Sequence, residues 1–335
     1  MKEGDNMSRF GLLPLLVTMS LMSRGVDAVD IEGAEVIDYF GYSGCIALAN
    51  EHTRVILTTH GGRILEYSRD GENAIHLDPV QEGWVYVPGE PTVDPTGGRL
   101  DIGPEAIIPR RPELWLGQWQ AEITGPRAAR LTSVEHAATG VQLVRDFVLD
   151  ETTSHLSVTQ TIRNISGQAT QWCHWSRTFG RGGGIVVIPL ACQSRFPNDY
   201  VMYGPGPVIN YRPEDPNIRV RDGFLEIVGP PARAKLGFDS CAGWFSYLSK
   251  NDLMWVKRFP VYPERVYNEM VGLTISIWYN KEEMTELEPI GPRETLAPGE
   301  SSSFTEDWWL LPHAYPETGE VDLEEIARMV DQQAR

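Results

Sequence analysis

The stretch Gln171–Pro189, QWCHWSRTFGRGGGIVVIP, decides how the rest of the chain is interpreted. Its side chains alternate in character. Because successive side chains of a β-strand point to opposite faces, Trp172 and His174 should share one face. The glycines at Gly182–Gly184 cannot continue a well-packed strand, so they predict a turn. A titratable ring beside an aromatic platform and a turn is typical of a pocket wall. The alternative is a half-buried structural histidine between packed tryptophans.

The same alternation recurs in short segments from residue 37 to residue 311, separated by turns rich in Gly, Pro, Asn and Asp. No alternation of strands with helices is visible, which argues against a parallel sheet. Only the tail has helical spacing, with apolar residues at Leu323, Ile326 and Val330. We therefore predict an all-β fold. It is an antiparallel β-sandwich formed by one domain over residues 29–312, followed by a tail, 313–335, that contains a short helix.

Composition argues against several classes of partner. The 335 residues include 46 acidic and 29 basic side chains, which gives a net charge of −17. Nucleic acid and anionic membrane surfaces need a basic protein surface, so neither is expected as a partner. An acidic protein with 10 tryptophans is compatible with a neutral saccharide ligand. The hydrophobic content of 41% is enough for a substantial core.

Residues 1–28 have the pattern of a signal peptide. Arg9 precedes the apolar run Gly11–Met22, and Ala28 is a small residue suited to cleavage. The run is shorter than the ~20 residues that a membrane-spanning helix needs, and no later segment is apolar enough to span a bilayer. We therefore expect cleavage after Ala28, export to the periplasm or beyond, and no membrane span.

Four cysteines, Cys45, Cys173, Cys192 and Cys241, are compatible with one or two disulfides in an exported protein. Free buried thiols are equally compatible, because a domain of this size does not need cross-links. The sequence leaves the pairing open. The cysteine spacing matches no zinc pattern, so neither a metal nor another cofactor is expected.

A second stretch, Glu282–Pro292 (EEMTELEPIGP), carries two carboxylates that bear on chemistry. In a strand, Glu286 and Glu288 point the same way, and Leu287 points to the opposite face. Two desolvated carboxylates on one face repel each other, which raises the pKa of one of them and suits a general base. The alternative is an exposed edge strand with solvated glutamates. The Gly-Pro turn that follows favours a strand end at the rim of a cleft.

Taken in order, the motifs resemble the galactose mutarotase (aldose 1-epimerase) superfamily, and over its whole length the chain is similar to exported bacterial members. Trp172–Ser176 stands where that family carries N-H-S-Y-F with the acid histidine, here His174. Glu286–Pro289 stands where it carries a C-L-E-T-Q-like strand, with the base glutamate at Glu288. Leu296–Glu300 resembles the L-x-P-G-E turn of many members.

The resemblance implies a β-supersandwich that binds a sugar in its concave face. It also implies a reaction. Glu288 takes the proton from the anomeric hydroxyl, His174 protonates the ring oxygen, and the opened ring recloses as the other anomer. The family's second histidine is missing at its expected place, since His60 lies in the early hairpin. Further candidates for saccharide binding are Arg99, Trp115, Trp172, Arg177, Lys235, Asp239 and Glu286.

The predicted function is a carbohydrate-active, mutarotase-like protein that binds a saccharide in its cleft and, in the first interpretation, interconverts its anomers. Two alternatives stay open. One is a carbohydrate-binding protein without turnover. The other is a polysaccharide lyase or an accessory domain of a glycoside hydrolase, for which Tyr203 would be the base and Arg177 and Lys235 the cations.

Overall fold

The computed structural model describes residues 31–333, except for 207 and 282. The signal peptide that the sequence predicts, its cleavage after Ala28 and the export that follows from it lie outside the described residues. Within the part of the chain that is described, no helix combines the length and the apolar character needed to cross a membrane.

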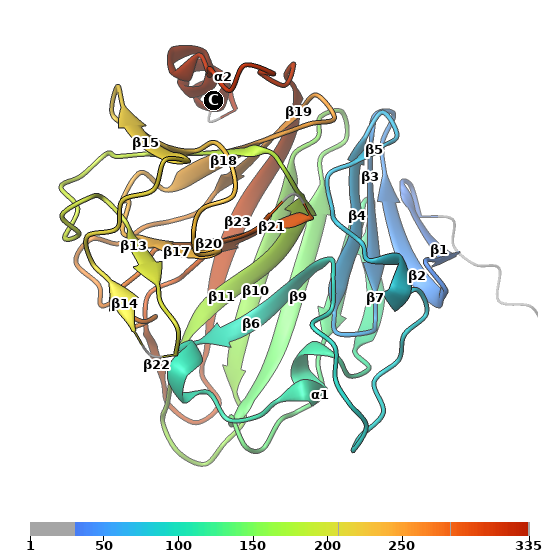
Figure 1. Cartoon of the computed structure of the whole chain (residues 1–335). Coiled ribbons are helices and arrows are strands. Elements are labelled where there is room, and N and C mark those ends of the chain that lie inside the picture. Colours follow the sequence, from blue (N-terminus) through green and yellow to red (C-terminus); the bar gives the residue numbers. More distant parts are fainter. Residues whose placement is uncertain (1–30, 207, 282, 334–335) are drawn as a thin grey trace, which may run out of the picture. The chain divides into compact units, whose positions relative to one another are not determined.

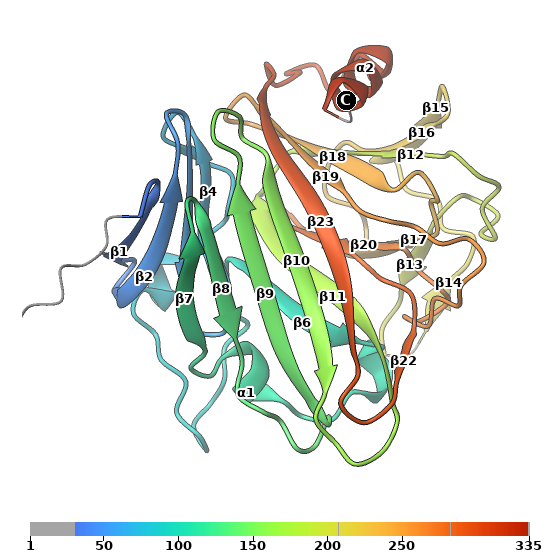
Figure 2. The ribbon, with the colours of Figure 1, turned by 180° about the vertical axis from the view of Figure 1, so that it is seen from behind.

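Two antiparallel sheets stack face to face, and Figures 1 and 2 show them from opposite sides. The first sheet has 13 strands, in the spatial order β1 (Ala34–Tyr39), β2 (Tyr42–Ala49), β3 (Thr53–Thr58), β4 (Arg63–Arg69), β6 (Gly98–Gly103), β11 (Thr170–Arg181), β21 (Met284–Pro289), β20 (Ile275–Asn280), β17 (Lys235–Phe238), β13 (Val201–Tyr203) and β14 (Ile209–Asn210), with β5 (Glu72–Asn73) beside β4 and β22 (Glu294–Leu296) beside β11. The second sheet has 10 strands, in the order β15 (Ile218–Arg221), β16 (Phe224–Ile227), β12 (Ile185–Pro189), β18 (Trp244–Ser249), β19 (Leu253–Arg258), β23 (Ser301–Pro312), β10 (Leu156–Asn164), β9 (Val141–Leu149), β8 (Ala128–Thr132) and β7 (Gln120–Gly125).

Helices are few among the described residues: α1 (Pro112–Trp115), α2 (Leu323–Gln332), and 3-10 turns at Pro79–Gln81 and Glu105–Ile107. The side chain of Asp322 caps α2 by accepting a hydrogen bond from the backbone N–H of Glu325 at 2.9 Å. The apolar face of α2 packs on the outer face of the second sheet through Leu323, Ile326 and Val330. The predicted all-β sandwich with one short C-terminal helix is therefore confirmed.

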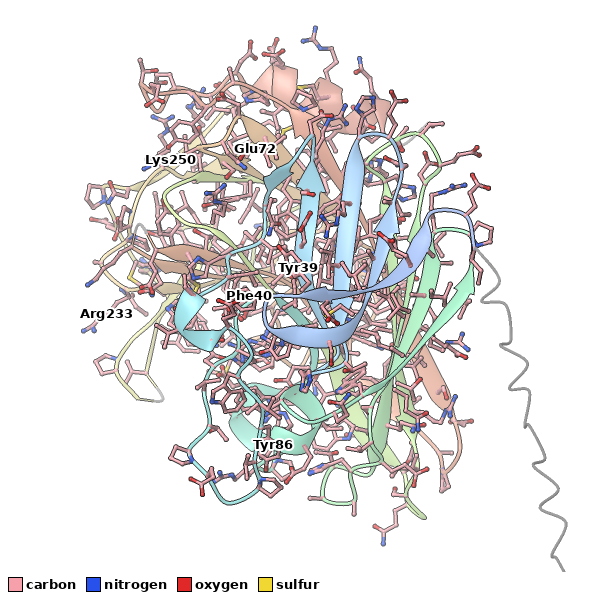
Figure 3. All side chains as sticks on the ribbon, turned by 90° about the vertical axis from the view of Figure 1, so that its right-hand side faces the viewer. Tyr39, Phe40, Glu72, Tyr86, Arg233 and Lys250 are labelled. Carbon is pink, nitrogen blue, oxygen red and sulfur yellow. A yellow bond between two sulfur atoms is a disulfide. The ribbon has the colours of Figure 1, made fainter. Side chains whose placement is uncertain are left out.

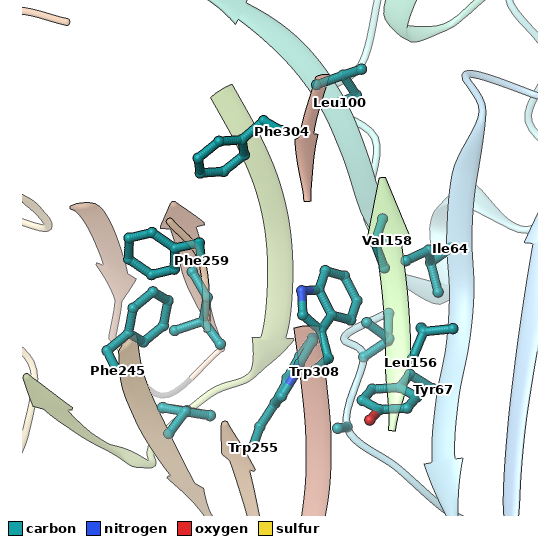
Figure 4. Packing of buried hydrophobic residues seen from close by; sticks show 14 of the residues in the cluster. Ile64, Tyr67, Leu100, Leu156, Val158, Phe245, Trp255, Phe259, Phe304 and Trp308 are labelled. Carbon is teal, nitrogen blue, oxygen red and sulfur yellow. The ribbon is translucent and has the colours of Figure 1, made fainter. Parts of the chain in front are cut away.

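The core fills the space between the inner faces of the two sheets, and Figure 4 shows its aromatic centre. Tyr67 of β4 packs against Trp255 of β19 and Trp308 of β23, with ring centres 5.7 and 5.9 Å apart. The indoles of Trp255 and Trp308 pack edge to face, with their ring centres 5.1 Å apart. Pairs of this kind add about 0.5–1.5 kcal/mol beyond the burial of their area. Aromatic side chains from both sheets therefore hold the layers together.

Two cations cross this core from the second sheet to the first. Arg145 of β9 is fully buried and donates to the backbone carbonyls of Gly62 and Gly98, at 2.7 and 2.9 Å. Lys257 of β19 is also fully buried, and its Nζ lies 3.4 Å from a carboxylate oxygen of Glu306 on β23. Buried charges are tolerated where they are paired or hydrogen-bonded. Lys257 is paired with Glu306, whereas Arg145 is hydrogen-bonded through Nη1 alone, and its Nε and Nη2 have no hydrogen-bond partner among the described residues.

The strand β11 contains most of the stretch with which the sequence analysis began. It pairs with β6 on one side and with β21 on the other. After Arg181 the glycines at Gly182–Gly184 carry the chain across to β12 in the second sheet, so the predicted turn is confirmed. Gly184 is required there, because a Cβ would lie 2.3 Å from the carbonyl oxygen of Leu248.

A disulfide joins Cys192 to Cys241, whereas Cys45 and Cys173 are buried free thiols. Cys192 follows β12 of the second sheet, and Cys241 follows β17 of the first sheet. The disulfide therefore links two loops that leave different layers of the sandwich.

Candidate functional site

Charged and aromatic side chains gather on the outer face of the first sheet, away from the second sheet. Lys235 of β17 lies opposite Trp278 of β20, and Trp278 lies opposite Glu286 of β21. Because cross-strand partners share a face, these three side chains form a row across the sheet. Arg177 of β11 and Glu288 of β21 lie on the same face, next to that row.

Four of these side chains form a cluster of ions, which we define as Arg177, Lys235, Glu286 and Glu288. Arg177 donates to both carboxylate oxygens of Glu286, at 2.7 and 3.1 Å, and to Glu288 at 3.3 Å. The guanidinium carbon of Arg177 lies 4.7 Å from the ring centre of Trp175, and Lys235 Nζ lies 5.2 Å from that same ring. A buried indole thus contacts both cations of the ion cluster.

Lys235 connects the ion cluster to the loop that follows β6. Its Nζ donates to the carboxylate of Glu105 at 2.5 Å and lies 5.0 Å from the ring centre of Tyr203. The backbone N–H of Glu105 donates to the buried carboxyl of Glu269 at 2.8 Å. Burial raises the pKa of Glu269 to about 7. The loop at Glu105 is therefore held to the sheet both by its side chain and by its backbone.

A cavity of about 460 Å³ opens at the ion cluster. Trp115 and Trp278, both half-buried, provide its aromatic walls, and Arg99 lies 5.0 Å from the ring centre of Trp115. Residues outside the strands, on either side of β6, supply more than half of the lining, which agrees with the usual role of connecting segments in binding sites. The complete lining is Thr92, Val93, Asp94, Glu105, Trp115, Arg177, Lys235, Trp278 and Glu286.

The two glutamates titrate as a pair, because both are buried and both contact one guanidinium. Burial raises the pKa of Glu286 to about 8. Burial acts in the same sense on Glu288, but Lys235 and then Arg177 outweigh it and hold the pKa of Glu288 below its ordinary value. Burial would lower the pKa of Lys235, but Glu288 and Glu105 outweigh it and raise that pKa. The two pKa values are therefore shifted in opposite directions, which makes Glu286 the more readily protonated carboxyl of the pair and Glu288 the more readily ionised one.

His174 lies on the opposite face of β11 from the ion cluster. Its Nε2 donates to the backbone carbonyl of Ser302 at 3.1 Å, and its ring stacks on that of Phe304 with centres 5.7 Å apart. The side chain is fully buried in the core, and burial lowers its pKa to about 4. The prediction that His174 and Glu288 face one cleft is wrong. The strand parity that points Arg177 outward points His174 inward.

Two candidates for saccharide binding also lie away from the cavity. Trp172 packs against the core, and its Nε1 donates to the backbone carbonyl of Thr139 at 3.1 Å. Asp239 accepts hydrogen bonds from the Ser194 hydroxyl at 2.6 Å and from the backbone of Arg195 at 2.9 Å. Both bonds lie in the loop that carries the disulfide, so Asp239 fixes that loop and does not reach the cavity.

The structure brings the remaining candidates together. Arg99 is only 2% exposed and borders the cavity through its contacts with Trp115 and Asp94. The sequence analysis missed Trp278 and Glu105. The pairing of β17 with β20 places Trp278 beside Lys235, and the turn after β6 brings Glu105 to the same lysine. The candidates that line the cavity are Trp115, Arg177, Lys235 and Glu286, and Glu288 contacts Arg177.

A second cavity, of about 410 Å³, lies where hairpins of the two sheets meet, and its lining includes His76, Glu72 and Lys250. Figure 3 labels Glu72 and Lys250 there, well away from Tyr86, which lies between the 3-10 turn at Pro79–Gln81 and β6. His76 is therefore not part of the ion cluster. Across the described ranges, no group of three or more His, Cys, Asp or Glu side chains is arranged to hold a metal ion.

Comparison with known proteins places the fold. No family model and no curated protein sequence matches the chain. A galactose mutarotase-like protein from Lactobacillus casei shares the fold with a TM-score of 0.56 and 12% identity, over 80% of this chain and 100% of that chain. The Slr1438 protein from Synechocystis sp. has a TM-score of 0.55 and 14% identity, over 83% of this chain and 100% of that chain. A galactose mutarotase-like protein from Clostridium acetobutylicum has a TM-score of 0.50 and 10% identity, over 84% of this chain and 99% of that chain.

The chain therefore has the β-sandwich fold of galactose mutarotase-like proteins. At identities this low, the likeness concerns the fold alone. The function has to be argued from the residues that line the cavity.

Proposed function

We propose that this protein binds a neutral saccharide in the cavity at the ion cluster. The observation that carries the proposal is the combination of two half-buried indoles, Trp115 and Trp278, with polar groups of Glu286, Arg177 and Lys235. The C–H face of a sugar ring packs on aromatic rings, and its hydroxyls exchange hydrogen bonds with a few convergent polar groups. The fold shared with galactose mutarotase-like proteins supports a carbohydrate-related role.

The balance of charge favours a neutral ligand over a polyanion. Glu288 is held between Arg177 and Lys235, so none of the described cations at the cavity is left over for a sugar carboxylate or sulfate. Binding a uronate would mean breaking one of these pairs, and a cation taken from Glu288 would leave a fully buried carboxylate without its partner. This argues against the lyase alternative. The charge pairs are Arg177–Glu288, Lys235–Glu105 and Arg99–Asp94.

A second candidate function is the interconversion of anomers, because the glutamate pair supplies an acid and a base side by side. Ionised Glu288 would take the proton from the anomeric hydroxyl as the bond between the anomeric carbon and the ring oxygen breaks. Protonated Glu286 would give its proton to that oxygen, and reclosure after rotation would yield the other anomer. In this assignment Glu286 takes the role that the family resemblance implied for His174.

The substitutions Trp115→Ala and Trp278→Ala test the saccharide site. A thermal-shift screen of neutral aldoses and oligosaccharides identifies a ligand, and calorimetry then gives its Kd. Each substitution should raise the Kd up to about tenfold, since aromatic packing of this kind is worth about 0.5–1.5 kcal/mol. Trp84→Ala is the matched control, because it removes a half-buried indole outside the cavity. Wild-type affinity in both cavity variants, or a preference for uronates, would contradict the proposal.

Polarimetry on freshly dissolved aldoses tests turnover. Glu286→Gln and Glu288→Gln should each slow mutarotation by about 100- to 10,000-fold, the usual effect of losing a positioned acid or base. His174→Gln should change the rate little, because this ring lies on the other side of the sheet. A wild-type protein that binds an aldose without accelerating its mutarotation would leave saccharide binding as the function.

A further inference from the structure

Lys257 approaches the ion cluster from the core side of the first sheet. Its Nζ donates to the backbone carbonyl of Leu287 on β21 at 3.1 Å and to the hydroxyl of Thr178 on β11 at 3.0 Å. Thr178 and Leu287 are register partners where the two strands pair. Leu287 stands between the two glutamates in sequence, so Lys257 contacts the backbone at the point from which both carboxyls project outward.

Packing alone does not require an ammonium group at this position. The Lys257 Nζ lies 4.3 Å from the ring centre of Trp308 and 5.4 Å from that of Trp255, in surroundings that an apolar side chain would also fill. Its partner Glu306 is fully buried as well, and accepts a hydrogen bond from the Trp308 indole at 2.8 Å. Replacing such a buried pair by apolar side chains is often neutral or stabilising. A role beyond stability is therefore the better physical account.

We propose that Lys257 is a positioning residue for the glutamate pair of the saccharide site. By holding the Leu287 carbonyl it fixes the twist of β21 at the two residues that present carboxyls to the cavity. Its positive charge lies on the far side of the sheet from those carboxyls and favours their ionised form. This inference rests on the proposed saccharide site and extends that site to a residue in the core.

Several charged groups surround Lys257 and the two glutamates, and the test has to distinguish the effect of Lys257 from theirs. Glu306 and Arg145 act on Lys257 within the core. Arg177, Lys235 and Arg99 act on the glutamates from the outer face. Of these described cations, Lys257 is the one that binds the backbone between the two glutamates.

The test measures the glutamates directly, with no sugar present. Carbon-13 NMR of the side-chain carboxyls should show that Lys257→Met with Glu306→Gln raises the titration midpoint of the Glu286–Glu288 pair by about half a pH unit, a threefold change in proton affinity. Glu226→Gln is the matched control. Glu226 is a buried carboxylate that pairs with Arg219 and Arg221, and its strand, β16, belongs to the second sheet, whereas β21 belongs to the first. It should leave the midpoint unchanged.

An unchanged midpoint in the folded double variant would overturn the inference, whether or not a saccharide binds. If the double variant fails to fold, titration of the wild-type protein still tests the role of Lys257. The carboxyl resonances of Glu286 and Glu288 should show an inflection at the pH at which the Lys257 ammonium loses its proton, and the absence of that inflection would overturn the inference. Saccharide binding is measured separately, so failure of the proposed function would appear as a wild type that binds no sugar.

Discussion

His174 is a neutral imidazole enclosed by the core, with one ring nitrogen bonded to the Ser302 carbonyl. Its pKa falls from the ordinary value of 6.5 to about 4 because burial disfavours the charged ring. Between pH 4 and pH 6.5 the unfolded chain binds a proton at this residue and the folded chain does not. Stability should therefore decrease as the pH falls from 6.5 to 4, by at most about 3 kcal/mol from this residue.

The substitution His174→Gln should remove this part of the pH dependence, since an amide can still donate to the Ser302 carbonyl but does not titrate. Urea unfolding at intervals between pH 4 and pH 7 measures the effect. We expect the wild type to be the more stable protein at pH 7 and the difference to narrow toward pH 4. Parallel curves for the two proteins would contradict the buried, neutral state of His174.

The helix α2 is the element whose contribution is simplest to isolate. Ile326 is fully buried against the outer face of the second sheet, so Ile326→Ala should cost about 2–5 kcal/mol. Asp322→Ala removes the N-cap and should cost about 1 kcal/mol. Arg328→Ala, at a solvent-exposed position of the same helix, is the control and should be nearly neutral. Chemical denaturation measures all three, and an equal effect of the Ile326 and Arg328 changes would show that the helix is not docked.

Most strands could be located from the sequence, because alternation is a local property. The alternating segments predicted between residues 37 and 311 include, for example, those that form β9 and β10. The sequence of a strand does not reveal which of its two alternating sets of side chains faces the core when both sets include aromatic rings. Trp172 points inward and Trp175 points outward on the same strand, so the pattern alone did not fix the side of His174.

The cavity was less predictable than the strands, since it depends on strand order. Lys235, Trp278 and Glu286 meet because β17, β20 and β21 are neighbours in the first sheet. No spacing within any one segment encodes that neighbourhood. The glutamate pair was found because its two carboxyls are close in sequence, whereas its cationic partners come from other strands.

At the scale of the whole molecule, the Cys192–Cys241 disulfide ties the two layers together at one end. It closes a loop with a sequence separation of 49 residues, and closing a loop of this size typically contributes about 2–4 kcal/mol. Replacing both cysteines by serine should therefore lower the melting temperature by several degrees. Calorimetry of the variant, and of the wild type with and without reductant, measures the change. An unchanged melting temperature would show that the two loops are held without the covalent link. Cys45 and Cys173 should resist alkylation until the protein unfolds, since both are buried.

The position of β23 has a consequence for folding during synthesis. This strand lies between β19 and β10 and thereby joins the two halves of the second sheet, yet it comes after every other described strand in sequence. While the chain emerges from the ribosome, the β7–β10 meander and the β18–β19 hairpin each wait with an unpaired edge until residues 301–312 are released. Exposed edges of this kind invite pairing with other chains. Nascent chains halted before residue 301 should therefore depend on chaperones, and the second sheet should close only once translation has passed β23.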